Sequence, residues 1–155
     1  MIQKILNNSL LPVLCLFIIL FLNKHSPTTQ QKITMPEIFS QSIVVSNYDS
    51  AIKEAKTHNR DILLVVEAKW CGYCKKFRKE VLTEKTIEDE LNNYVICIID
   101  YKENSQIIKK YNISKLPSYV LIDNEGNLIK EGYGYQTKNI FIKWLKNYKS
   151  PKTDL

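Results

Sequence analysis

The chain has 155 residues and a net charge of +6, with 25% charged and 45% hydrophobic residues. This length suits one compact domain with a short extension, and the ordinary composition excludes wholesale disorder. The lysines are interleaved with acidic residues and form no basic block, so the sequence predicts no nucleic-acid partner.

Residues 1–25 differ in kind from the rest of the chain. The segment "LLPVLCLFIILFL" (10–22) carries no charge and is preceded by Lys4. An apolar run of this length matches a signal-peptide core better than a full membrane span, which needs about 20 residues. No small-residue cleavage site follows, so a signal peptide and an uncleaved N-terminal membrane anchor both stay open. Both predict membrane contact through residues 5–22 and a protein that is exported, either periplasmic or anchored and facing the extracytoplasmic side.

The next segment, 26–40, is predicted to be a linker, because it is polar, contains two prolines and has no periodic apolar face. The folded domain is predicted over 41–150, with a short tail at 151–155. Within this domain, two apolar runs rich in branched residues, 61–68 and 94–100, are typical of strands that are covered on both faces.

Helices and strands alternate along the predicted domain. Apolar spacing and composition predict five helices, over 48–59, 71–82, 86–93, 104–112 and 137–148. Thr86 is the predicted cap of the third helix. The turn residues after 118–123 predict a hairpin with 127–134. This order predicts an α/β fold, with a central mixed β-sheet and helices on both faces.

The segment "EAKWCGYCKKF" (67–77) places two cysteines where a predicted strand ends and a predicted helix begins. A thiol at a helix N-terminus faces unpaired N–H groups and the positive end of the helix dipole, and both favour the thiolate. We therefore expect Cys71 to attack a partner disulfide and Cys74, nearly one turn later, to resolve the mixed disulfide. Gly72 is predicted to leave the backbone conformationally free at the turn into the helix. Tyr73 is predicted to offer a flat apolar surface to the substrate.

The sequence gives less support to other roles for the two cysteines. A structural zinc site needs four ligands, and the remaining cysteines, Cys15 in the apolar leader and Cys97 in a buried strand, form no second pair. We expect no metal and no cofactor beyond the dithiol. Cys97 is interpreted as a buried hydrophobic residue, with a regulatory thiol as the alternative.

The motif "WCGYCKKF", followed by "YNISKLPSYVLID", resembles the thioredoxin superfamily over roughly residues 43–148. The longer pattern "LLVVEAKWCGYCKKFRKEVL" is similar to exported thioredoxin-like thiol:disulfide interchange proteins. The resemblance implies a thioredoxin-like fold with a cis Leu116–Pro117 peptide facing the cysteines. It also implies that the backbone beside Pro117 pairs with substrate, and that Leu116 tunes potential and specificity. Trp70 is expected to shield the active-site sulfurs.

Two positions depart from the family pattern. Gly-Tyr stands between the cysteines in place of Gly-Pro, and Val65 stands where thioredoxins keep a buried Asp. Glu67 lies on the same strand face as Val65, since side chains alternate along a strand. Two interpretations of Glu67 stay open: a replacement for the missing proton acceptor, or a solvent-facing residue near the strand end.

The resemblance implies a thiol–disulfide oxidoreductase whose substrates are cysteine-containing proteins, engaged near Trp70, Tyr73 and Pro117. It further implies a membrane redox partner that restores the working state, and we expect a monomer. A reductase is favoured. An oxidase, an isomerase, a thiol peroxidase and a non-redox binding or chaperone module remain as alternatives, because the residues alone do not set the direction of exchange.

Overall fold

The structure is a computed structural model that describes residues 42–148. The expected leader (1–25), linker (26–40) and tail (151–155) lie outside the described residues. Within 42–148, no helix combines the length and apolar character needed to cross a membrane.

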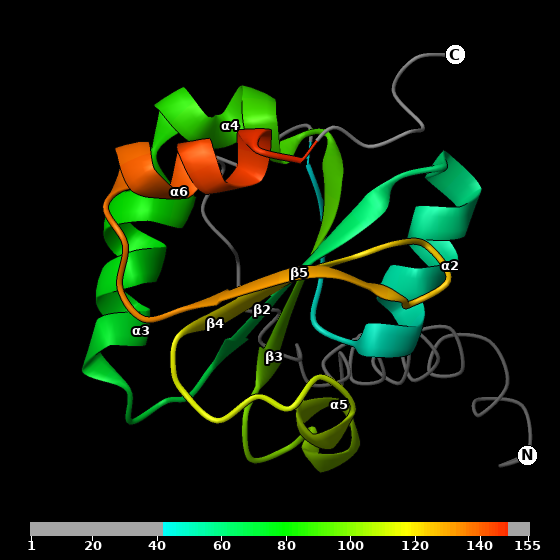
Figure 1. Cartoon of the computed structure of the whole chain (residues 1–155), viewed down its shortest axis with the longest axis horizontal. Helices are drawn as coiled ribbons and strands as arrows, with labels where there is room; N and C mark the ends of the chain where they lie inside the picture. Colours follow the sequence, from blue (N-terminus) through cyan, green and yellow to red (C-terminus); the bar gives the residue numbers. More distant parts are fainter. Residues whose placement is uncertain (1–41, 149–155) are drawn as a thin grey trace, which may run out of the picture. The chain divides into compact units, whose positions relative to one another are not determined.

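A mixed five-stranded sheet forms the centre of the described domain (Figure 1). The strands are β1 (Ile43–Val45), β2 (Asp61–Glu67), β3 (Tyr94–Asp100), β4 (Ser118–Ile122) and β5 (Leu128–Tyr133). They lie in the order β1-β3-β2-β4-β5. β3 pairs in parallel with β1 and β2, and β4 is antiparallel to β2 and β5. β2 and β3 are therefore internal, which explains their uninterrupted apolar sequences.

Helices cover both faces of this sheet, which confirms the predicted α/β architecture (Figure 1). They are α2 (Tyr48–His58), α3 (Gly72–Phe77), α4 (Lys85–Leu91), α5 (Ser105–Lys110) and α6 (Lys138–Lys146), with a π-helical turn η2 (Arg78–Leu82) directly after α3. α3, α4 and α6 lie on one side of the sheet, and α2 and α5 lie on the other (Figure 1).

The core divides between the two faces because the side chains of β2 alternate. Leu63 and Val65 belong to a cluster with residues of α3, α4 and α6, whereas Ile62, Leu64 and Val66 pack on the opposite side with residues of α2 and the α5 region. The last residue of β2, Glu67, follows the first of these series. It therefore points to the side of the sheet on which α3 lies.

Three details differ from the sequence-based expectations. The helix predicted over 71–82 changes to π-helix at Arg78. Thr86 is not the cap of α4: the helix begins at Lys85 with Glu84 as N-cap, and the amide of Ile87 donates to the Glu84 carbonyl at 3.0 Å. Thr86 therefore lies inside the first turn. Finally, β1 was not predicted, because three residues are too few to show a strand periodicity.

Candidate active site

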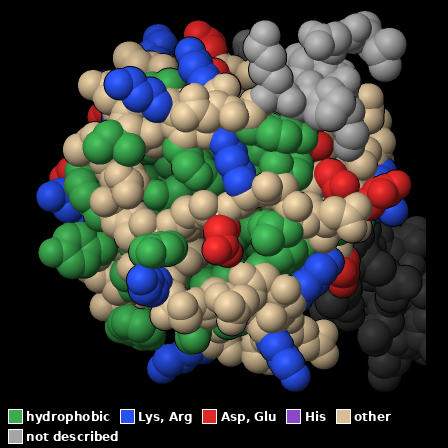
Figure 2. Space-filling view, in the orientation of Figure 1, with side chains coloured by type: hydrophobic (Ala, Val, Ile, Leu, Met, Phe, Trp, Pro, Cys, Tyr) green, Lys and Arg blue, Asp and Glu red, His purple; other side chains and the backbone are tan. Residues whose placement is uncertain are grey.

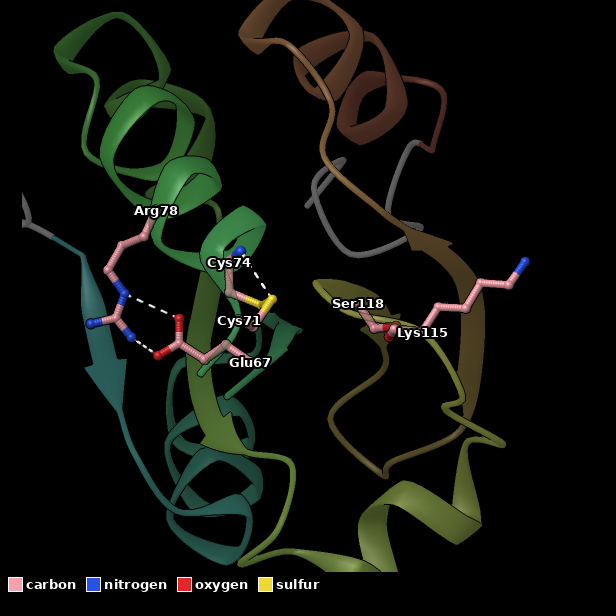
Figure 3. Close-up of a disulfide and its surroundings, with 6 residues drawn as sticks. All are labelled: Glu67, Cys71, Cys74, Arg78, Lys115 and Ser118. Carbon is pink, nitrogen blue, oxygen red and sulfur yellow. Dashed lines mark hydrogen bonds and ion pairs between the residues drawn. A yellow bond between two sulfur atoms is a disulfide. The ribbon is translucent and has the colours of Figure 1, made fainter. Parts of the chain in front are cut away.

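Cys71 and Cys74 form a disulfide where the chain leaves the central strand β2 and enters α3 (Figure 3). Cys71 is the N-cap of α3, with an extended backbone at φ −85° and ψ 105°. Its Sγ accepts a hydrogen bond from the Cys74 amide at a distance of 3.1 Å. The end of the helix thus directs a backbone N–H at the Cys71 sulfur, as a stabilised thiolate requires.

The two cysteines differ in exposure. Cys71 is 7% exposed and Cys74 is 2% exposed, and both pack against Ala68 with the partly buried Tyr101 and Leu116 beside them. Attack on a protein disulfide needs an accessible sulfur, whereas resolution takes place within the protein. The difference in exposure favours Cys71 as the attacking residue and Cys74 as the resolving one.

The loop before β4 lies on the opposite side of the disulfide from α3. Its Leu116–Pro117 peptide bond is cis. The Pro117 carbonyl accepts from the Gly134 amide at 2.7 Å, and the Ser118 hydroxyl donates to the Lys115 carbonyl at 2.6 Å. These bonds hold the loop at both ends of the cis peptide. Figure 3 shows Ser118 and Lys115 across the disulfide from Glu67.

Two aromatic side chains flank the disulfide at the surface. Trp70 is 64% exposed and Tyr73 is 66% exposed. With Leu116 and four other residues they line an open groove of about 390 Å³ that reaches Cys71. The structure thus brings five residues singled out in the sequence to one groove: Trp70, Cys71, Gly72, Tyr73 and Leu116. Large exposed aromatic rings beside a reactive group are typical of surfaces that bind protein segments.

Gly72 lines the same groove, but the structure shows no need for glycine there. Its φ lies outside the left-handed region, and no atom comes within 4 Å of the position that a Cβ would occupy. The expected permissive role in the turn is therefore not required by the backbone. The absence of a side chain instead leaves the groove open above Cys71.

Glu67 forms an ion pair with Arg78, the first residue of η2 (Figure 3). Its carboxylate accepts from Arg78 Nε at 3.1 Å and also from Nη2. The two side chains are only 20% and 34% exposed, so Glu67 is not a free solvent-facing residue. Desolvation by burial lowers the pKa of Arg78 below its usual range.

The Glu67–Arg78 pair lies next to the resolving cysteine. Glu67, Arg78 and Cys74 line one open pocket of about 590 Å³, on the α3 side of the sheet. Val65, at the position of the acidic residue of thioredoxins, is buried in the apolar core. Sequence reasoning missed Arg78. The available signal was its position four residues after Cys74, which places both on one face of a helix.

Cys97 lies apart from this site, in the interior of β3. It is a free thiol with no exposed surface, and burial raises its pKa to about 12. The thiol therefore stays protonated and unreactive at neutral pH. Within residues 42–148, no group of three or more His, Cys, Asp or Glu side chains is placed to hold a metal ion.

The comparisons with known proteins agree on one family. Residues 48–149 match the profile of a thioredoxin-like domain. The chain is 29% identical over 115 residues to the thiol:disulfide interchange protein DsbD of Cronobacter sakazakii, which covers 70% of this chain and 20% of that protein. It is 26% identical over 99 residues to DsbD of Actinobacillus pleuropneumoniae, covering 60% of this chain and 17% of the relative. The chain thus spans about a fifth of the length of these curated relatives.

Solved structures show the same fold. A thioredoxin from Thermus thermophilus aligns with a TM-score of 0.62 at 18% identity, covering 69% of this chain and 86% of that one. The C-terminal domain of Neisseria meningitidis DsbD in its oxidised form aligns with a TM-score of 0.58 at 19% identity, covering 65% and 91% of the two chains.

Proposed function

The chain belongs to the thioredoxin-like family, and we propose that it is a thiol–disulfide oxidoreductase that reduces protein disulfides outside the cytoplasm. The observation that carries this proposal is the Cys71–Cys74 disulfide at the start of α3, beside the groove that the loop of the cis Leu116–Pro117 peptide helps to line. The names of its relatives, thiol:disulfide interchange proteins, support the same chemistry.

The reaction starts from the dithiol form of the pair. The Cys71 thiolate attacks one sulfur of the substrate disulfide, so a mixed disulfide forms as the substrate S–S bond breaks, and the leaving sulfur takes up a proton. Cys74 then loses its proton and attacks the Cys71 sulfur. This second step releases the other substrate thiol and closes the Cys71–Cys74 disulfide. Two electrons have then passed from the protein to the substrate.

The groove of Trp70, Tyr73 and Leu116 is the proposed substrate-binding surface. Among the described residues, no hydrogen bond engages the backbone of Leu116. Its amide and carbonyl are thus available to an extended substrate segment, which would add a short strand beside Pro117. The two exposed aromatic rings would cover the apolar side chains of that segment and keep water from the reacting sulfurs.

We propose that Glu67 accepts the proton that Cys74 loses in the second step. Both residues line the same pocket, and Glu67 is the only acidic residue among those that line it. Arg78 orients the carboxylate by two hydrogen bonds. The substitution Glu67→Gln keeps the shape of the side chain and removes the acceptor charge. We expect the second step to slow by at least about 10-fold while attack by Cys71 changes little. Rapid-mixing kinetics of mixed-disulfide decay measure this.

The matched control is Glu54→Gln in α2, where the carboxylate pairs with His58. This variant should resolve the mixed disulfide at the wild-type rate. Equal decay rates in the Glu67→Gln variant and in the wild type would remove Glu67 from the mechanism.

The location and the electron supply belong to the proposal as well. The apolar segment 10–22 supports export or anchoring to a membrane, with the domain on the extracytoplasmic side. A reductase there depends on a membrane redox partner that returns electrons to Cys71 and Cys74. We propose that the thioredoxin-like domain works as a monomer.

The direct test is to trap the mixed disulfide. The substitution Cys74→Ser removes the resolving thiol, so a full-length variant mixed with an oxidised protein substrate should accumulate a covalent adduct through Cys71. Mass spectrometry of the peptide that contains Cys71 identifies the bond. The double variant Cys71→Ser with Cys74→Ser should form no adduct. Failure of the single variant to form any adduct would contradict the proposed reaction.

A further inference from the structure

The excess positive charge of the described domain is concentrated around the two cysteines. Residues 67–80 contain five basic and two acidic side chains, and Lys115 directly precedes Leu116. All the other residues of 42–148 contain eleven basic and twelve acidic side chains together. The surface away from the site is therefore close to neutral.

These basic side chains surround the disulfide on both sides. Lys69, Lys75 and Lys79 are exposed and line the pocket that reaches Cys74. The exposed Lys115 belongs to the loop on the other side of the disulfide. Its side chain extends away from the sulfurs, and its Nζ lies 4.0 Å from the centroid of the Tyr133 ring (Figure 3). In Figure 2, hydrophobic side chains protrude next to Lys and Arg side chains near the part of the molecule where α3 begins. We call Lys69, Lys75, Lys79 and Lys115 the active-site lysines.

Neighbouring acids leave most of this charge uncompensated. The Glu67 carboxylate is occupied by Arg78. Glu103 lies 3.8 Å from Lys69, but these side chains are 69% and 88% exposed, so water screens the pair. The ion pairs among the described residues include none with Lys75, Lys79 or Lys115. Within the described residues, no carboxylate therefore neutralises these three charges near the disulfide.

We propose that the protein partner of this domain presents acidic side chains next to the cysteine that Cys71 attacks. The inference rests on the proposed function and specifies its substrate class. Trp70 and Tyr73 line the groove that reaches Cys71, and three active-site lysines line the neighbouring pocket that reaches Cys74, so positive charge lies beside the apolar groove. Complementary charges at a rim speed correct encounters and slow the approach of basic partners.

A membrane with anionic lipids is the other surface that attracts lysines and exposed aromatic rings. Docking on a bilayer would cover the same groove that leads to Cys71 and would keep protein disulfides away from it. The position of the sulfur inside the charged surface therefore favours an acidic protein segment.

The test uses the reduced full-length protein and three synthetic peptides. The peptides share one intramolecular disulfide and differ only in four residues that flank the cysteines, which are Asp, Asn or Lys. The fluorescence of Trp70, exposed beside the disulfide, reports the bimolecular rate. At 0.1 M salt we expect the Asp peptide to react about 10-fold faster than the Lys peptide. In 1 M salt, where the screening length falls from about 10 Å to about 3 Å, the ratio should shrink to about twofold.

A charge-reversed variant separates the protein's contribution from the intrinsic reactivity of each peptide. The double substitution Lys75→Glu with Lys79→Glu should abolish or invert the preference for the Asp peptide. Its matched control is Lys53→Glu with Lys56→Glu in α2, which makes the same change in net charge at exposed positions. Lys56 lies shortly before the start of β2, whereas Cys71 follows the end of this strand, so this control should keep the wild-type preference. If the charge-reversed variant does not fold, the double substitution Lys75→Gln with Lys79→Gln takes its place, because it removes the two charges without reversing them.

The outcomes separate the two proposals. If none of the peptides reacts, the proposed oxidoreductase function fails. If all three react with one rate in the wild type, the function stands and the acidic-partner proposal is overturned. The proposal is also overturned if the peptides show no preference and vesicles of phosphatidylglycerol bind the wild type more strongly than the charge-reversed variant, because the active-site lysines then serve a lipid surface.

Discussion

Replacing Cys71 by serine is expected to lower the rate of protein disulfide reduction by at least about 10³-fold. A serine hydroxyl does not ionise near neutral pH, and the attacking group of thiol–disulfide exchange is the thiolate. The backbone N–H that points at the Cys71 sulfur stabilises this charge only if the side chain carries it. Turbidity from reduced insulin, followed with dithiothreitol as electron donor, measures the rate.

The control for this prediction is Cys97→Ala. Cys97 has no exposed surface and lies in β3, outside the cluster of Cys71, Cys74 and Ala68. This variant loses one thiol as well, but it should reduce insulin at the wild-type rate. Wild-type reduction by the Cys71→Ser variant would show that another group carries the reaction.

The second large effect is on stability. Phe77→Ala should lower the free energy of unfolding by about 3–5 kcal/mol. Phe77 has no exposed surface, stacks on Tyr119 with ring centroids 5.4 Å apart and meets Phe141 edge-on at 5.0 Å. Truncation therefore opens a cavity where α3 packs on β4 and α6. Urea unfolding followed by far-ultraviolet circular dichroism gives the value.

Lys76→Ala, one residue earlier on the exposed side of α3, is the matched control for Phe77→Ala. It should change the free energy of unfolding by no more than about 0.5 kcal/mol. A loss below about 1 kcal/mol in the Phe77→Ala variant would mean that the aromatic cluster does not hold α3 in place. Since Phe77 follows Cys74 by three residues, this packing also fixes the position of the resolving thiol.

The sequence reveals the sheet well where strands are internal. The runs that became β2 and β3 are apolar throughout, since helices cover both of their faces. Details that depend on backbone hydrogen bonding are harder to predict from the sequence. The start of α4 depends on a bond from Ile87 to Glu84, and the π-helical turn at Arg78 has no distinct composition.

The chemistry of the site is predictable where it depends on local spacing. Two cysteines three positions apart behind a strand indicate both the disulfide and its place at the helix start. The Glu67–Arg78 ion pair is different, because it joins the end of a strand to the middle of a helical segment. Its formation depends on how α3 packs over β2, which periodicity does not specify. The same holds for one of the active-site lysines. Lys69, Lys75 and Lys79 lie within eight residues of Cys71 in the sequence, whereas Lys115 lies 41 residues after Cys74 and reaches the site only through the fold.

The reduction potential of Cys71–Cys74 in the full-length protein tests the central claim most directly. The protein is equilibrated in glutathione buffers of known ratio, free thiols are trapped, and the modified cysteines are counted by mass. We predict a reversible two-electron step at or below about −250 mV, in the range of thioredoxin. A step near roughly −120 mV would mark an oxidant and contradict the proposed direction. If the pair shows no reversible two-electron step, the protein is not a thiol–disulfide oxidoreductase.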